Sequence, residues 1–271
     1  QLTHSGRYSR PLDKPAPIPA HHDGLLDGVT GVQPDQPLIS DEALDALVER
    51  YVRAALLARR CGFDGVDIKS CHRYLLSELL AARTRPGAYG GSFEHRTRLL
   101  LTIVRKARQA APDLLLSVRL NLYDGHPYPW GWGVSPQDAA APDLDEPLRL
   151  IGLLREAGVG LINVTAGNPY YTPHINRPFD QNVVGGYTPD EHPLQGVARL
   201  IHLAREVKAC YPDLPVVGTG YSWLRQHVGK VAAGVLARGW ADRVGLGRAA
   251  FAYPDFARDL LDKGTLDAVH V

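Results

Sequence analysis

The chain has 271 residues, of which 45% are apolar, enough to bury the core of one large domain or of two small ones. Its 30 lysines and arginines face 29 acids, leaving a formal charge of +1. That balance excludes the strongly basic surface that nucleic acids or anionic membranes require. A small molecule is therefore the expected partner.

Three cysteines, Cys61, Cys71 and Cys210, lie far apart and include no Cys-x-x-Cys pair. We expect reduced thiols in a cytoplasmic protein, with no disulfide framework and no metal site. Cys71 is expected to be a buried, inert thiol. No apolar run approaches the ~18 residues of a membrane span and no signal peptide is recognisable, so no membrane contact is expected. An oligomer of identical subunits is compatible with the sequence.

Helices and strands are predicted to alternate along the chain. A helix follows the capping residues Ser40, Asp41 and Glu42 and runs to Arg60, with apolar residues on one face. Further helices are predicted at residues 93–111, 146–157, 193–210, 224–237 and 254–263, and strands at 65–69, 114–120, 161–165, 216–219 and 243–246. The strands are short continuous apolar runs, which is typical of a parallel sheet covered on both faces.

Polar residues and glycines follow nearly every predicted strand. They are Lys69, Cys71 and His72; Arg119 and Asn121; Asn163 and Thr165; Thr219 and Gly220; and Gly245, Gly247 and Arg248. The carboxyl ends of parallel strands meet at one edge of the sheet, so the five groups should converge there. This pattern favours a closed (β/α)8 barrel over an open doubly wound sheet.

Glycines recur in the last two strand ends, "VVGTGYS" (216–222) and "VGLGRA" (244–249). In barrels the corresponding loops commonly bind phosphate, because glycine lets backbone N–H groups approach the anion. Arg248 would add a charge-assisted contact. The alternative is that these glycines only allow tight turns. The pairing of two such loops favours phosphate, held by a mononucleotide cofactor or a phosphorylated substrate.

Several motifs resemble the old yellow enzyme family of flavin-dependent oxidoreductases. They are "QLTHSGR" (1–7), "YGGSFEHRTR" (89–98), and "GLGR" followed by "YPDFARDLL". The stretch "GNPYYTPHINRP" is most similar to the trimethylamine dehydrogenase and 2,4-dienoyl-CoA reductase branch. The resemblance implies a (β/α)8 barrel that binds FMN, with NADH or NADPH as the reductant.

The resemblance also implies roles for individual residues. Gln1 matches a glutamine at the flavin pyrimidine edge, and Arg119 matches an arginine near flavin N1 and O2. The expected phosphate cradle consists of Gly218, Gly220, Gly247 and Arg248. Its agreement with the glycine pattern strengthens the interpretation.

Lys69, His72 and Tyr74 are the expected catalytic residues. The family usually has His-x-x-His or His-x-x-Asn here, two donors that grip a substrate oxygen, and a tyrosine that protonates the substrate. Lys69 departs from this pattern: its ammonium can polarise a carbonyl or hold a carboxylate, but cannot accept a proton. Alternatively, Lys69 pairs with an acid such as Glu78, His72 is structural and Tyr74 is core packing.

Two loops, residues 126–133 and 168–178, are rich in aromatic residues and proline and are candidate lids. In the second, His174 and Arg177 are expected to touch an anionic group of the substrate. The alternative is that both are ordinary surface residues.

The resemblance implies hydride transfer from reduced flavin to an alkene conjugated to a carbonyl. Three alternatives stay open: a flavin-dependent amine dehydrogenase or demethylase, a Schiff-base enzyme using Lys69, and a truncated barrel without activity. The family barrel has two strand–helix units before "QLTHSGR", and the sequence contains no Met. We therefore expect residues 1–271 to form one FMN-binding barrel domain that is incomplete at its N-terminus.

Overall fold

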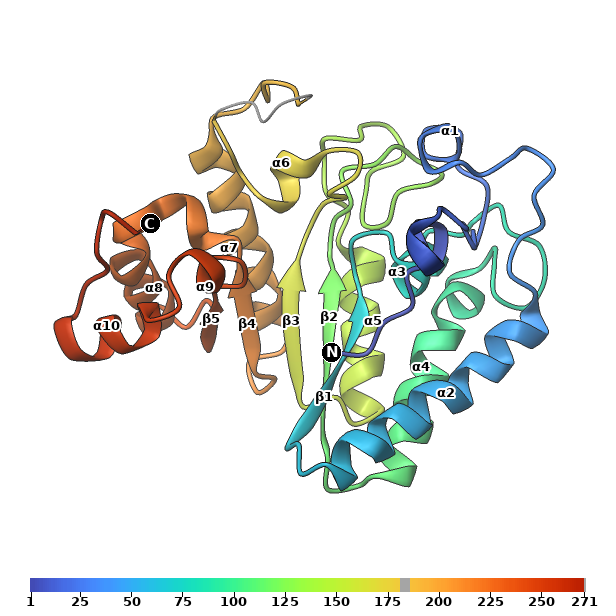
Figure 1. Ribbon diagram of the computed structural model, residues 1–271, viewed down its shortest axis with the longest axis horizontal. Helices are drawn as coiled ribbons and strands as arrows, with labels where there is room; N and C mark the ends of the chain where they lie inside the picture. Colours follow the sequence, from blue (N-terminus) through green and yellow to red (C-terminus); the bar gives the residue numbers. More distant parts are fainter. Residues whose placement is uncertain (181–185, 271) are drawn as a thin grey trace.

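A parallel sheet forms the centre of the computed structural model, which describes residues 1–180 and 186–270. Within these residues the sheet has five strands in chain order: β1 (Gly65–Ser70), β2 (Leu115–Asn121), β3 (Leu161–Thr165), β4 (Val216–Thr219) and β5 (Arg243–Gly245) (Figure 1). An isolated parallel bridge between Leu2 and Ile68 sets the N-terminal segment beside β1. The predicted parallel α/β architecture is confirmed.

Helices connect the strands, as parallel pairing requires. The long ones are α2 (Asp41–Arg60), α4 (Phe93–Ala110), α5 (Asp145–Glu156), α7 (Pro193–Cys210), α8 (Val228–Ala237) and α10 (Phe256–Lys263). Short helices are α1 (Asp27–Thr30), α3 (Leu75–Leu80), α6 (Pro173–Asn176) and α9 (Ala249–Ala252), with 3-10 turns η1 (Gly6–Tyr8), η2 (Pro11–Asp13) and η3 (Tyr221–His227). None of the helices in the described part of the chain is long and apolar enough to cross a membrane.

The sequence explains where the long helices begin. The Ser40 hydroxyl accepts a hydrogen bond from the Ala43 amide at 3.1 Å and caps α2, as predicted. Ser92 caps α4 in the same way through the His95 amide. The helix predicted at 224–237 is shorter: residues 221–227 form the 3-10 segment η3, which is kinked at Arg225 (φ 50°), and α8 begins at Val228. The helix predicted at 254–263 begins at Phe256.

The two faces of the sheet differ. Side chains on one face are apolar and buried under the helices: Val66, Ile68, Leu116, Val118, Leu120, Ile162, Val164 and Val216. On this side α2 packs against α4, and α7 packs against β3 and β4. The other face carries polar side chains that are mostly half-buried. The core thus fixes the strands, and the polar face is available for a site.

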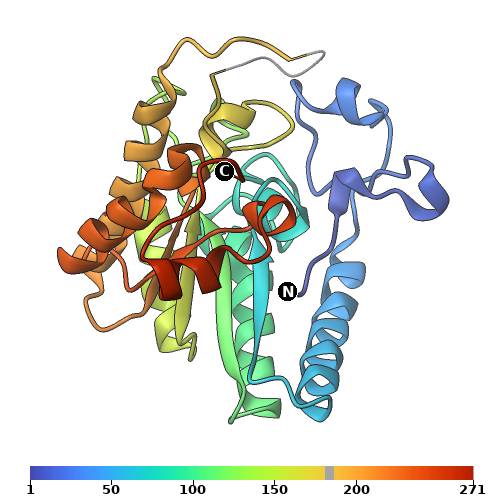
Figure 2. The ribbon, with the colours of Figure 1, turned by 60° about the vertical axis from the view of Figure 1, so that its left-hand side comes forward.

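In the described residues the sheet is open rather than a closed barrel. β5 pairs only with β4, and β1 is joined on its outer side only by the bridge to Leu2. Figures 1 and 2 show the N-terminal segment and α2 at one end of the sheet and the C-terminal helices at the other. The strand order follows the chain, as in successive strands of a barrel.

Candidate active site

The polar face brings together the side chains that the sequence predicted at the strand ends. Lys69 on β1 is the register partner of Arg119 on β2, and Arg119 is in turn the partner of Asn163 on β3. Asn121 and Thr165 form the next pair toward the carboxyl ends. Because register partners on neighbouring parallel strands point to the same face, these side chains share one surface.

His72 lies in a tight turn that follows β1. His72 and Arg73 have φ of 61° and 59°, the left-handed region that non-glycine residues rarely occupy. The His72 backbone N–H donates to Asn121 Oδ1 at 3.4 Å. Its ring Nε2 lies 2.8 Å from Asn176 Nδ2 and 3.4 Å from Thr165 Oγ1. Burial, followed by the charges of Arg119, Lys69 and Arg248, lowers the pKa of His72 to about 3, so the ring is neutral at pH 7.

Lys69 contacts the next predicted residue, Tyr74. The ammonium lies 3.2 Å from the centre of the Tyr74 ring, a cation–π contact. The Tyr74 hydroxyl is 3.2 Å from that of Tyr170, and Tyr170 stacks on Tyr8 with ring centres 3.8 Å apart. The alternative partner of Lys69, Glu78, is instead bound by Arg7, so the Lys69–Glu78 pairing is wrong. Burial lowers the pKa of Lys69.

Positive charge on this face has no acidic partner. Within residues 1–180 and 186–270, Lys69, Arg119, Arg177 and Arg248 make no salt bridge, and the buried Nε of Arg119 has no hydrogen-bond partner. Burial and the nearby charges of Arg177 and Arg119 lower the pKa of Arg248. Lys69 and Arg119 are half-buried, where a cation is normally paired, and Arg177 and Arg248 are exposed. These four residues, here called the cation group, are therefore suited to an anion that the protein itself does not supply.

The predicted phosphate glycines differ from one another. Gly247 has no atom within 4 Å of the position a Cβ would take, so nothing in the protein requires a glycine there. A Cβ on Gly220, which has φ 95°, would overlap the Leu200 side chain, and one on Gly218 would lie 3.0 Å from the Tyr221 hydroxyl. The turn alternative thus accounts for Gly220, whereas Gly247 leaves space beside Arg248 for a ligand.

Two other predicted residues make local contacts. Gln1 Nε2 donates to Asp67 Oδ2 at 2.5 Å, which holds its amide against β1. His174 Nδ1 is hydrogen-bonded to the Tyr187 hydroxyl, and its Nε2 lies 3.9 Å from Glu191. Both partners of His174 lie in the segment between α6 and α7. Cys71 is fully buried, and burial raises its thiol pKa to about 12, as expected for an inert thiol.

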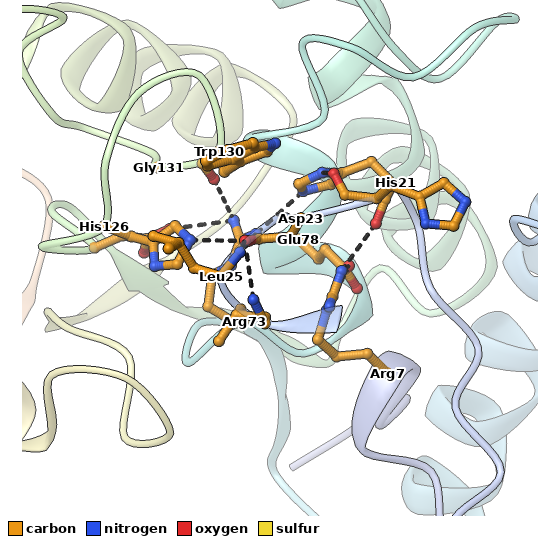
Figure 3. A network of polar contacts seen from close by, with 12 residues as sticks. Arg7, His21, Asp23, Leu25, Arg73, Glu78, His126, Trp130 and Gly131 are labelled. Carbon is orange, nitrogen blue, oxygen red and sulfur yellow. Dashed lines mark hydrogen bonds and ion pairs between the residues drawn. The ribbon is translucent and has the colours of Figure 1, made fainter. Parts of the chain in front are cut away.

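A buried network of ion pairs around Arg73 and Arg7 was not predicted from the sequence (Figure 3). Arg73 lies 3.0 Å from Asp23 and 3.5 Å from Asp124, and Asp23 also accepts from His126 Nε2 at 2.9 Å. Burial alone would raise the pKa of Asp23, but His126 and Arg73 outweigh it and lower it. The network anchors Arg73, which precedes Tyr74 and follows His72.

The other half of the network uses Arg7 of the "QLTHSGR" motif. Its Nε donates to Glu78 at 2.8 Å, and its Nη2 donates to the His21 carbonyl at 2.8 Å. The motif that suggested a flavin contact thus also fixes the N-terminal segment to α3. The contacts of Asn176 and Thr165 with the His72 ring were also not predicted from the sequence. No sequence signal linked them, because they belong to β3 and α6, about 100 residues away.

The residues present fit a flavin mononucleotide. Arg119 offers a buried N–H without a partner, Gly247 and Arg248 offer space and charge for a phosphate, and the cation group lacks an acid. Arg119 would hold the pyrimidine side of the ring system, where charge stabilises the reduced form.

Comparison with known proteins gives consistent matches. Residues 1–127 match the model of the NADH:flavin oxidoreductase / NADH oxidase family. An NADH oxidase of Thermoanaerobacter brockii is 28% identical over 269 residues, covering 95% of this chain and 35% of that protein. The NADH-dependent flavin oxidoreductase iliE of Hypocrea jecorina is 29% identical over 273 residues, covering 94% of this chain and 62% of that protein. The chain thus spans less than two thirds of either relative.

Solved structures show the same fold. A 2-naphthoyl-CoA reductase in complex with 2-naphthoyl-CoA matches with a TM-score of 0.69 at 20% identity, covering 97% of this chain and 37% of that chain. An old yellow enzyme homologue from Zymomonas mobilis matches with a TM-score of 0.57 at 21% identity, covering 85% of this chain and 55% of that chain. At these identities the likeness shows the fold alone. With the sequence motifs, the match over residues 1–127 and the two relatives support the resemblance of this chain to the old yellow enzyme family of flavin-dependent oxidoreductases.

Proposed function

We propose that residues 1–271 contribute the FMN-binding face of a (β/α)8-type barrel enzyme that uses NADH to reduce an alkene conjugated to a carbonyl. The family match and the NADH-dependent relatives support FMN as cofactor and NADH as reductant. One observation carries the proposal: Lys69, His72 and Tyr74 lie together beside an unpaired Arg119 on the polar face of the sheet.

Each residue has a distinct task in this reaction. Bound FMN would supply hydride to the β-carbon of the alkene. The Lys69 ammonium and the His72 ring donate to the carbonyl oxygen and stabilise the negative charge that develops there. Tyr74 delivers a proton to the α-carbon through its hydroxyl. Because Lys69 already contacts the Tyr74 ring, both residues can meet one substrate.

The cation group also favours a substrate with an anionic substituent, such as a carboxylate beside the enone. After Arg119 and Arg248 are assigned to the flavin and its phosphate, Lys69 and Arg177 remain without an acid. Lysine holds a carboxylate more strongly than a neutral imidazole does. The same excess of positive charge opposes the amine dehydrogenase alternative, because an amine substrate is a cation at pH 7.

Stopped-flow kinetics of the flavin-loaded protein test the proposal, with the two half-reactions measured separately. Lys69→Ala should lower the rate of flavin reoxidation by an enone ~10²–10³-fold, the usual loss for one oxyanion donor. Reduction of the flavin by NADH should change far less, because that step develops no substrate oxyanion. Lys106→Ala, which removes an exposed lysine paired with Glu49 on a distant helix face, serves as the control.

Three outcomes would contradict the proposal. A colourless protein that cannot be reconstituted with FMN would favour the barrel without activity. Reduction of the flavin by amines, with no reoxidation by enones, would favour the amine dehydrogenase. Irreversible labelling of Lys69 by a carbonyl compound and borohydride would favour the Schiff-base enzyme.

A further inference from the structure

Asn176, the last residue of α6, joins the loop after β3 to His72 in the turn after β1. Its Nδ2 lies 2.8 Å from His72 Nε2, 3.1 Å from the Ala166 carbonyl oxygen and 3.4 Å from Thr165 Oγ1. The Asn176 side chain is half-buried between these groups. Within the described part of the chain, two residues of the aromatic loop 168–178 bond to an expected catalytic residue: Tyr170 bonds to Tyr74, and Asn176 bonds to His72.

The chemistry of the three partners fixes which amide atom faces them. The Ala166 carbonyl oxygen can only accept a hydrogen bond, so the amide atom 3.1 Å away is the NH₂ nitrogen rather than the oxygen. An NH₂ group has two hydrogens, and the shortest contact of this nitrogen is with His72 Nε2. His72 Nε2 therefore accepts a hydrogen bond and carries no proton. In a neutral imidazole the remaining proton is then on Nδ1.

The other ring nitrogen is placed differently. Within residues 1–180 and 186–270, Nδ1 of His72 makes no hydrogen bond, and it is not among the fully buried polar atoms that lack a partner. Nε2 is thus held by the protein while Nδ1–H remains available to a ligand. This division of roles requires a donor at position 176.

We propose that Asn176 is a positioning residue that fixes His72 in the Nδ1–H tautomer, so that His72 meets the substrate oxygen with its Nδ1–H. The tautomer stands on the geometry alone; the role toward substrate rests on the proposed function. The charged groups that face His72 are Lys69, Arg119 and Arg248, all cations. An acid at position 176 would therefore be the first carboxylate against this ring.

NMR of the flavin-free protein labelled with ¹⁵N tests the tautomer directly, because the two ring nitrogens have different shifts when protonated and unprotonated. The His72 signals, among those of 11 histidines, are assigned by their loss in His72→Gln. The wild-type protein should show Nδ1 protonated and Nε2 unprotonated at pH 7. A protonated Nε2 in the wild type would overturn the proposal.

Asn176→Asp is the decisive variant. A carboxylate accepts a hydrogen bond from Nε2 and cannot donate one, so His72 should switch to the Nε2–H form or become doubly protonated, with its pKa raised. Asn163→Asp is the matched control: it adds the same charge to the same face without touching His72, and the tautomer should not change. If Asn176→Asp retains Nδ1–H, the proposal is wrong.

A second variant covers the case in which Asn176→Asp does not fold. Asn176→Ala removes the donor without adding charge, so the His72 signals should show a mixture of tautomers; a pure Nδ1–H form would contradict the proposal. In the flavin-loaded enzyme, either variant should lower enone reduction about 10- to 100-fold and leave reduction by NADH unchanged. A tautomer switch in a protein that reduces no enone would overturn the proposed function and leave the role of Asn176 intact.

Discussion

Arg73 and Arg119 come from neighbouring strand ends, yet their surroundings are opposite. Arg73 is fully buried and lies between the carboxylates of Asp23 and Asp124. Arg119 lies on the polar face and, within the described residues, makes no salt bridge, although the Nε of both arginines is buried without a hydrogen-bond partner. Removing a cation whose charge is balanced inside the fold leaves its acids unpaired, whereas we propose that a cation left without an acid meets a ligand. The difference separates the charges that are paired within the fold from those for which we propose a functional role.

The largest expected effect is on stability and follows from Arg73. Arg73→Ala leaves Asp23 and Asp124 buried without their common partner, which should lower the free energy of unfolding by about 3–5 kcal/mol. Urea unfolding followed by circular dichroism measures the loss. Arg248→Ala, which breaks no ion pair, should stay within about 0.5 kcal/mol of the wild type. Equal losses in the two variants would show that the arginine paired with buried acids stabilises the fold no more than the unpaired one does.

Arg119→Gln should show the reverse behaviour. The stability of the flavin-free protein should hold or rise, because the change removes a positive charge that lies beside Lys69 and Arg248. Flavin binding should weaken about 10- to 150-fold, the equivalent of the ~1.5–3 kcal/mol of a hydrogen bond to a charged group. Fluorescence titration with FMN measures the dissociation constant. Unchanged binding of FMN would show that Arg119 faces something other than the flavin.

A further effect concerns acid and is spread over several pH units. His72 has a pKa of about 3 in the folded protein and about 6.5 when unfolded. Between these values the unfolded chain binds the extra proton, so the folded state loses stability as the pH falls from 6.5 toward 3, by at most about 1.4 kcal/mol per pH unit for this group. His72→Gln should flatten that part of the stability profile. A profile as steep as that of the wild type would place the acid sensitivity in other groups, such as His21, whose pKa burial also lowers.

The sequence predicted the strands well, since each is a short segment rich in apolar residues between two helices, and the observed bounds agree to within one or two residues. It also placed Lys69, His72 and Tyr74 at one strand end. A (β/α)8 barrel incomplete at its N-terminus was expected, and the described residues form an open five-stranded parallel sheet; the number of missing units stays a prediction. The break at Arg225 could not be predicted, because it is a backbone conformation with no glycine to signal it.

The partners of Arg73, Glu78 and His72 could not be predicted either. Each is a single polar residue in a loop or short helix, and no spacing or repeat connects it to its partner. Asn176 and His72 lie 104 positions apart, and their contact depends on how the loops after β1 and β3 fold over the sheet. Only the three-dimensional arrangement shows which of these polar residues meet.

The network around Asp23 also has a consequence for the order of folding. Asp23 joins Arg73, 50 positions away, and His126, 103 positions away, while Arg7 joins Glu78 across 71 positions. The contacts across 71 and 103 positions close longer loops than the β1–β2 pairing, whose register partners lie 50 positions apart, and are expected to form after it. Interactions absent from the folding transition state slow unfolding and leave the folding rate unchanged. The ion pairs of this network should therefore lower the unfolding rate of the protein and have little effect on its folding rate.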